Sequence, residues 1–107
     1  MKSVQTGIIG IAIDGLCIDL IAHRATKAGK EIKLTEREFA LLRVLMEVSP
    51  GMIDKSTLYR HVWGENIKDP TNVVNVYIRH LRKKIVGPGQ TPTIRTTRNK
   101  GFALISF

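Results

Sequence analysis

The sequence predicts an α+β fold in which a small antiparallel β-meander is followed by three helices and a C-terminal β-hairpin. Three observations support this prediction. Short alternating apolar runs, separated by turn dipeptides, fill the first part of the chain. Apolar residues at helical spacing dominate the middle, and two β-branched runs flank a turn near the C-terminus. The length of 107 residues suits one domain with one modest core.

Four strand-like runs make up the predicted meander. Asp14-Gly15 and Ala28-Gly29-Lys30 mark two tight turns, because their residues tolerate the backbone angles of hairpin loops. The runs span residues 8–13, 16–20, 21–26 and 31–34. Their polar residues form neither paired carboxylates nor a ligand cluster, so we expect the meander to support a site elsewhere.

A helix is predicted to begin after Thr35. The sequence Thr35-Glu36-Arg37-Glu38 is a capping box, in which the Thr35 and Glu38 side chains each accept a backbone N–H of the first turn. Capping and the helix dipole therefore explain Glu36 and Glu38 better than acid–base catalysis does. Ser49-Pro50-Gly51 ends the helix. The stripe expected to enter the core is Phe39, Leu42, Leu45 and Met46.

A shorter helix is predicted between Asp54 and Gly64, with Asp54 as its N-cap and Gly64 as its stop. Leu58, Val62 and Trp63 lie on its inward side, and we expect Trp63 to pack in the core rather than to stack on a base. A short polar loop then leads to the next helix, as in a helix-turn-helix unit.

The stretch from Asp69 to Ile85 has the strongest pattern in the chain. Asp69 suits the N-cap and Pro70 the first helical position. Val74, Ile78, Leu81 and Ile85 form one apolar stripe, and Asn72, Val76, Arg79 and Lys83 lie opposite, with His80 at their flank. A helix with such a face suits the major groove of DNA. An ordinary surface helix with a solvated basic face is the alternative.

The C-terminal segment predicts a β-hairpin with a basic tip. Residues 93–97 and 102–106 are β-branched or aromatic-rich, and Arg98-Asn99-Lys100-Gly101 joins them. A tip with Arg98 and Lys100 can reach into a minor groove or along phosphates, as a wing does. A merely solvated tip is less favoured, because tip and preceding helix share their positive sign.

Positive charge is concentrated in the last part of the chain. The net charge is +8, but Met1 through Pro70 contain 10 basic and 9 acidic residues. From Thr71 onward there are seven basic residues and no acidic one. This asymmetry indicates that the binding partner is a polyanion. Nucleic acid fits better than an anionic membrane, because no long amphipathic helix has aromatic anchors. The 6% of aromatic residues argues against single-strand stacking platforms of RNA-binding proteins.

The residue pattern predicts no catalytic, cofactor or metal site. The histidines are far apart, and no cysteine or carboxylate lies at ligand spacing from them. Cys17 lies in an apolar alternating run, so we expect it to be buried and inert in a reducing cytoplasm. No apolar run approaches the ~20 residues that cross a bilayer. The N-terminus is interpreted as a strand rather than a signal peptide.

Four motifs accompany this order of elements. They are LTEREFALLRVL (Leu34–Leu45), LYRHVWG (Leu58–Gly64), TNVVNVYIRHLRKKI (Thr71–Ile85) and IRTTRNKGFAL (Ile94–Leu104). Together they resemble the OmpR/PhoB-type winged-helix DNA-binding domain, over essentially the whole chain. The resemblance implies a winged helix-turn-helix with residues 1–107 as a single domain and no receiver domain present.

The resemblance also implies roles for matching positions. Arg98 would be the wing arginine near the minor groove, and the loop Glu65-Asn66-Ile67-Lys68-Asp69 would contact RNA polymerase. Independently of the resemblance, the basic residues Arg82 and Lys100 are expected to neutralise phosphates. The residues facing the major groove would be Asn72, Val76, Arg79, His80 and Lys83.

Three positions depart from the family pattern. Asn75 replaces a usual aspartate, which removes the acidic partner of any charge pair made there. His80 stands where an arginine is common, so base preference is expected to differ. Arg98-Asn99-Lys100-Gly101-Phe102 replaces the usual RGxGY, so the first turn glycine is missing.

We therefore predict a sequence-specific, double-stranded DNA-binding transcriptional regulator without catalysis or cofactor. It would be the effector module of a two-component-type response regulator, or a stand-alone relative. Its implied partners are double-stranded DNA, RNA polymerase, a second copy on tandem half-sites and, for an excised fragment, a receiver domain. Its expected place is the bacterial cytoplasm, at the nucleoid when bound. The alternative is a winged-helix protein–protein interaction module, which would need exposed apolar residues where basic ones occur.

Overall fold

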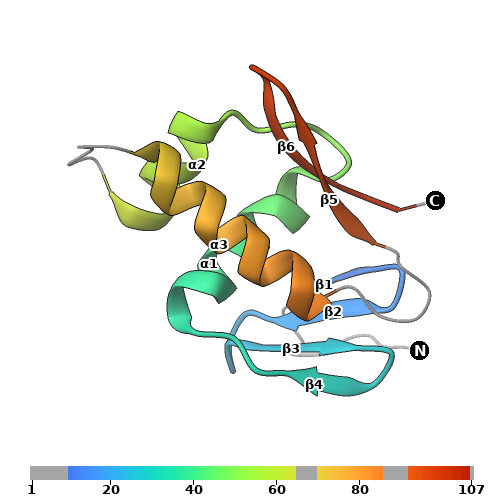
Figure 1. Ribbon diagram of the computed structural model, residues 1–107. Coiled ribbons are helices and arrows are strands. Elements are labelled where there is room, and N and C mark those ends of the chain that lie inside the picture. Colours follow the sequence, from blue (N-terminus) through green and yellow to red (C-terminus); the bar gives the residue numbers. More distant parts are fainter. Residues whose placement is uncertain (1–9, 65–69, 86–91, 107) are drawn as a thin grey trace.

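The computed structural model describes residues 10–64, 70–85 and 92–106, with only the backbone at residues 70–72. These ranges contain a four-stranded sheet, three helices and a two-stranded hairpin, in that order. Figure 1 shows the helices between the sheet and the hairpin. The predicted α+β class is therefore confirmed. No helix in these ranges has the length and apolar content needed to cross a membrane.

The sheet is an antiparallel meander whose strands pair in sequence order: β1 (Gly10–Ile13), β2 (Leu16–Asp19), β3 (Arg24–Lys27) and β4 (Lys30–Ile32). Asp14 and Gly15 join β1 to β2 with φ angles of 51° and 83°. Ala28 and Gly29 join β3 to β4 with φ angles of 52° and 83°. Positive φ at both central positions matches the twist of the flanking strands, so both predicted turns are confirmed.

The run predicted as a strand from Ile21 to Thr26 begins as a turn instead. The Asp19 carboxylate accepts hydrogen bonds from the backbone N–H groups of Ala22, at 3.0 Å, and Ile21, at 2.9 Å. These two bonds lower the pKa of Asp19 and stabilise a turn around its side chain. Strand β3 consequently begins at Arg24.

Cys17 is exposed, so the prediction that it is buried was wrong. Strand β2 alternates, with Leu16 and Ile18 buried and Cys17 on the solvent side. Successive side chains of a strand point to opposite faces, so the side that a residue occupies is set by its buried neighbours and not by its own apolar character.

The first helix, α1 (Glu36–Val48), begins in the predicted capping box. The Thr35 backbone N–H donates to Glu38 Oε1 at 2.9 Å, and the Glu38 backbone N–H donates to Thr35 Oγ1 at 3.2 Å. Two N–H groups of the first turn, which have no partner within the helix, are satisfied in this way. The helix ends at Ser49, as predicted.

The second helix, α2 (Lys55–Trp63), is shorter and also capped as predicted. The Asp54 carboxylate accepts the Thr57 backbone N–H at 3.2 Å and its hydroxyl at 2.6 Å. These bonds lower the pKa of Asp54. Gly64 ends the helix with a φ of 96°, and its N–H donates to the Arg60 carbonyl at 3.0 Å.

The third helix, α3 (Pro70–Ile85), closes the core over α1 and α2. Its predicted stripe is fully or almost fully buried, and so is the predicted stripe of α1. Leu41 was not predicted to be inside, but it has no exposed surface. The largest fully buried side chains are Phe102, Leu16, Leu41, Leu42, Leu45, Leu58, Ile78, Leu81, Ile85 and Leu104, with Val74 and Pro92.

The hairpin consists of β5 (Thr93–Thr97) and β6 (Gly101–Ile105). Phe102 is buried, and its backbone exchanges two hydrogen bonds with Ile53, each of 2.9 Å. Gly101 has a φ of 137°, and a Cβ at this position would overlap the Ile53 carbonyl. Glycine is therefore required where the hairpin meets the segment that leads into α2.

Glu38 makes a second interaction, with Lys84 of α3. Lys84 Nζ lies 2.7 Å from Glu38 Oε1 and also donates to the Lys33 carbonyl at 3.1 Å. The Glu38 side chain is 5% exposed. Burial raises the pKa of Glu38, but the hydrogen bond from Lys84 and the bonds from Thr35 outweigh this effect, so its pKa is lowered.

We predict that Glu38→Gln lowers the free energy of unfolding at pH 7 by about 1–3 kcal/mol. The folded-state pKa of Glu38 is depressed, so its carboxylate contributes stability above the unfolded pKa of about 4.3, and this contribution is lost as pH falls through the folded pKa. The wild-type chain should therefore lose more stability than the variant between about pH 5 and pH 3. Denaturant titration over this pH range measures the difference.

The matched control is Glu47→Gln on the same helix. Glu47 pairs with Arg43 at 3.1 Å, but both side chains are 44% exposed, so its loss should cost less than about 0.5 kcal/mol. Equal pH dependence in wild type and Glu38→Gln would show that the pair of Glu38 with Lys84 contributes no stability.

Candidate nucleic-acid interface

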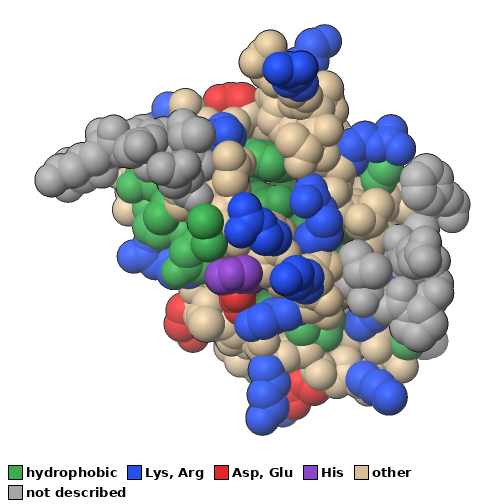
Figure 2. Space-filling view, in the orientation of Figure 1, with side chains coloured by type: hydrophobic (Ala, Val, Ile, Leu, Met, Phe, Trp, Pro, Cys, Tyr) green, Lys and Arg blue, Asp and Glu red, His purple; other side chains and the backbone are tan. Residues whose placement is uncertain are grey.

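Helix α3 exposes the basic face that the sequence predicts. Val76, Arg79 and Lys83 are exposed opposite the buried stripe, and His80 is exposed beside them. Figure 2 shows Lys and Arg side chains gathered over α3 and at the hairpin tip, with a histidine among them. The side chain of Asn72 lies outside the described residues, as does the loop at residues 65–69. The described members of the predicted face are thus together on one surface.

Aromatic packing sets how α2 crosses α3. Trp63 stacks on Tyr59 with ring centroids 5.2 Å apart, and it meets Tyr77 of α3 edge-on at 5.0 Å. The Arg37 guanidinium lies 5.5 Å from the Trp63 ring centroid. Offset and edge-on pairs of this kind add to the stability given by area burial. Trp63 therefore has the packing role that the sequence predicts.

Arg82, which the resemblance assigns to DNA, contacts the hairpin in this structure. Its Nε donates to the Ile94 carbonyl at 3.0 Å, and one terminal nitrogen donates to Thr96 Oγ1 at 2.9 Å. The rigid guanidinium thereby joins α3 to β5 through two bonds. Arg82 orients the hairpin relative to α3, a contact that the sequence did not reveal because the partners are 12 and 14 residues away.

The carbonyl end of α3 is held by the meander. Lys27 Nζ donates to the carbonyl of Ile85, the last residue of the helix, at 3.3 Å. A cation at this end also interacts favourably with the helix dipole. Together with Lys84, Lys27 anchors α3 to the first half of the chain.

The tip of the hairpin keeps a tight turn although its first glycine is missing. The Lys100 N–H donates to the Thr97 carbonyl at 3.0 Å, and Asn99 takes a φ of 63°. Asparagine is one of the few residues that tolerate this left-handed conformation, so it replaces the glycine. Arg98 and Lys100 are both exposed at the tip, as predicted.

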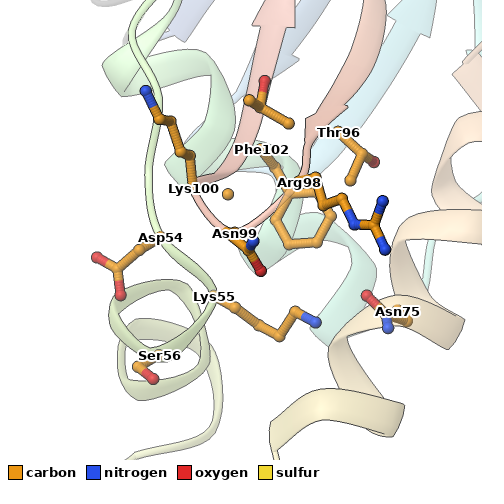
Figure 3. A pocket seen from close by; sticks show the side chains of 11 residues that line it. Asp54, Lys55, Ser56, Asn75, Thr96, Arg98, Asn99, Lys100 and Phe102 are labelled. Atoms are coloured by element: carbon orange, nitrogen blue, oxygen red, sulfur yellow. The ribbon is translucent and has the colours of Figure 1, made fainter.

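A groove of about 510 Å³ lies between the start of α2, the middle of α3 and the hairpin tip. Its polar lining includes Lys55, Asn75, Arg98 and Lys100, together with the capping residue Asp54. In Figure 3, Lys55 from α2 and Arg98 from the hairpin tip both extend toward Asn75, whereas Asp54 and Lys100 point away from it. Lys55 has no role in the sequence-based prediction, because residues of three separate elements form the groove.

The described residues include no group of three or more His, Cys, Asp or Glu side chains that could hold a metal ion. The exposed face of α3 and the hairpin tip present cations, and Asn75, Thr96 and Asn99 add amide and hydroxyl groups to the groove. These groups can donate hydrogen bonds to anionic oxygens or to base edges.

Comparison with known proteins gives a consistent result. The family model described as "Transcriptional regulatory protein, C terminal" matches residues 29–104. The response regulator ArlR of Staphylococcus aureus (strain Mu50 / ATCC 700699) is 38% identical over 94 residues, which are 88% of this chain and 43% of ArlR. The chain therefore spans less than half the length of the curated relatives that it matches.

Solved structures share the fold. One, described as "A novel family of redox sensors in the streptococci evolved from two-component response regulators", has a TM-score of 0.81 and 31% identity, covering 98% of this chain and 45% of that one. The Klebsiella pneumoniae RstA DNA-binding domain, solved in complex with the RstA box, has a TM-score of 0.76 and 26% identity, covering 89% and 95%. The predicted winged-helix architecture is confirmed.

We predict that Arg82→Lys loosens the hairpin although the charge is kept. A lysine cannot make the two bonds of the planar guanidinium, so the free energy of unfolding should fall by about 1–2 kcal/mol. Backbone amides of β5 and β6 should exchange faster with solvent, as measured by hydrogen–deuterium exchange. Arg95→Lys, at an exposed position of the same hairpin, is the control and should change neither quantity. Unaltered exchange in Arg82→Lys would contradict the orienting role.

Proposed function

This chain belongs to the OmpR/PhoB-type family of transcriptional regulatory C-terminal domains, and from this premise we propose that it binds double-stranded DNA sequence-specifically to regulate transcription. The family consists of DNA-binding regulators and not of enzymes. The observation that supports the finer proposal is the exposed basic face of α3, fixed by a fully buried stripe and adjoined by a basic hairpin tip. A rigid helix with such a face fits the major groove.

Each residue of the face has a proposed role. Arg79 lies near its centre and would read a base edge, together with Asn72. His80 would reach a base or a phosphate at the rim, and Val76, which is 38% exposed, would pack on a thymine methyl group. Lys83, in the last turn of α3, would neutralise a phosphate.

The hairpin would extend this contact along the duplex. Arg98 would enter the neighbouring minor groove, where a narrow A·T-rich segment attracts a cation, and Lys100 would contact the backbone. Arg82, in our proposal, contributes through its two bonds to β5 and through its charge near the phosphates. In this proposal Arg82 positions the hairpin, and Arg98 recognises the minor groove.

The remaining partners follow from the family. We propose that the chain binds tandem half-sites as a dimer, and that the loop Glu65-Asn66-Ile67-Lys68-Asp69 contacts RNA polymerase. A receiver domain would control it in a longer protein, since the matching relatives are more than twice as long as the match. The proposed site of action is the bacterial nucleoid, in the cytoplasm.

A winged-helix surface can also bind protein. Such a module should expose large apolar side chains on the recognition helix. Among the described residues of α3, Val76 alone is an exposed large hydrophobic residue, and the exposed cations Arg79 and Lys83 lie on the same face. The charge of this face therefore favours DNA.

We predict that Arg79→Ala relaxes base preference inside the half-site by roughly 1–3 kcal/mol, because a direct base contact is lost. Arg98→Ala should instead cost most affinity on sites with A·T-rich flanks. The measurement is binding-site selection with the purified wild-type chain, followed by affinities of both variants for site panels changed in the core or the flank.

The two variants serve as controls for each other. Arg79→Ala should leave the preference for A·T-rich flanks intact, and Arg98→Ala should leave the base preference inside the half-site intact. If Arg98→Ala lowered affinity equally for every flank, the wing would act as a phosphate clamp and not as a reader of groove width. Absence of any selected sequence for the wild-type chain would refute the proposed function.

We also predict that Glu65→Ala and Lys68→Ala alter transcription while promoter affinity stays unchanged, because this loop is proposed to touch polymerase. Run-off transcription with purified polymerase, combined with affinities for the same promoter, separates the two effects. Parallel loss of DNA binding and transcription would count against the assignment of this loop.

A further inference from the structure

We propose that the groove between α2, α3 and the hairpin tip seats one backbone phosphate of bound DNA, with Lys55 as its charged contact and Asn75 as its neutral contact. This inference rests on the proposed function and adds two residues to the binding surface. Both are absent from the sequence-based assignment, and both line the groove.

The geometry of the duplex requires a strand at this place. Adjacent major and minor grooves are separated by one sugar-phosphate strand. If α3 occupies the major groove and the hairpin tip the neighbouring minor groove, that strand must pass between them. The groove lies between Asn75 on α3 and Arg98 on the tip, and Lys55 at the start of α2 also lines it.

The lining of the groove suits a phosphate. In Figure 3 the Lys55 and Arg98 side chains both extend toward the side of α3 that bears Asn75, so two cations and one amide face the same space. The acidic residue of the lining, Asp54, points away, and its carboxylate oxygens accept both bonds from Thr57. The charge that an incoming anion meets is therefore positive.

Lys55 and Asn75 are available for such a contact. In the described ranges neither side chain makes a hydrogen bond or an ion pair, in contrast to the side chains of Arg82 and Lys84, which bond to other residues of the chain. An amide N–H at Asn75 can donate to a phosphate oxygen, whereas an aspartate at this position would repel it. The amide at this position thus makes the groove more receptive to an anion than a carboxylate would.

The first test is the salt dependence of binding to a selected duplex. Each phosphate contact contributes about 0.9 to the slope of log affinity against log salt concentration. Lys55→Gln should reduce the slope by about 0.9, and Lys55→Arg should restore it. Lys30→Gln, at an exposed lysine of the meander, is the control and should keep the wild-type slope. Thermal unfolding of each variant verifies that the fold is intact.

The second test locates the phosphate. The wild-type chain is bound to a series of duplexes, each with one phosphate replaced by a neutral methylphosphonate. One replacement, on the strand between the two grooves, should lower the affinity by on the order of tenfold. The same replacement should cost Lys55→Gln less than about threefold, because the interaction is already lost. Asn75→Asp should weaken binding to the unmodified duplex, because its carboxylate repels the phosphate. Replacing that phosphate by the neutral methylphosphonate should reduce this loss of affinity.

The outcomes distinguish this proposal from the function on which it rests. If the wild-type chain binds the duplex but Lys55→Gln keeps the full salt slope and the full methylphosphonate profile, the groove does not hold a phosphate and the proposed function stands. If the wild-type chain binds no duplex, both proposals fail. If Lys55→Gln lost its sensitivity to a single phosphate while the control variant did not, the result would support phosphate binding in the groove.

Discussion

The burial of one stripe of α3 is the constraint on which the rest of the surface depends. Val74, Ile78, Leu81 and Ile85 are at most 2% exposed, and each such side chain stabilises the fold by about 1.5–3 kcal/mol. A helix bound to its core by four side chains cannot rotate about its axis without exposing them. Arg79 and Lys83 are therefore held outward by residues on the other side of the helix. Recognition and stability share one element, but they use opposite faces of it.

The positive charge of the second half divides into two groups. Arg82 and Lys84 are bound to carbonyl, hydroxyl and carboxylate oxygens of other residues of the chain. Arg79, Lys83 and Arg98 are exposed and face solvent. Net charge alone therefore overstates the cations available to a polyanion, although long-range attraction depends on all of them. The internal pair of Lys84 with Glu38 has a second effect, because it joins the last turns of α3 to the first turn of α1.

Local physics made much of the fold predictable. The cap at Thr35, the turns at Asp14-Gly15 and Ala28-Gly29, and the stripe of α3 all depend on residues within a few positions of one another. Contacts between distant segments could not be derived in this way. The partners of Lys84 and of Lys27 lie 46 and 58 residues away, and no periodicity encodes them. The groove is a further example, since three separate elements form it. The error at Cys17 had a different cause, because an apolar residue in an alternating strand can face either side.

Two anchors determine how far the hairpin tip lies from α3, and this distance decides what the surface can bind. At one anchor, the backbone of Phe102 bonds to that of Ile53, and the lack of a side chain at Gly101 permits the close approach. At the other, Arg82 bonds to β5. The first joins the hairpin to the start of α2, and the second joins it to α3 itself. The position of the hairpin relative to α2 and α3 is consequently set by backbone contacts and by a rigid guanidinium. A surface ordered before binding loses less conformational entropy when the partner arrives, so its specificity can depend on shape as well as on charge. Because the hairpin is held at a fixed distance from α3, the sugar-phosphate strand of a bound duplex must lie at a matching distance from the major-groove contacts of α3. The width of the DNA minor groove next to this strand therefore becomes part of what is recognised.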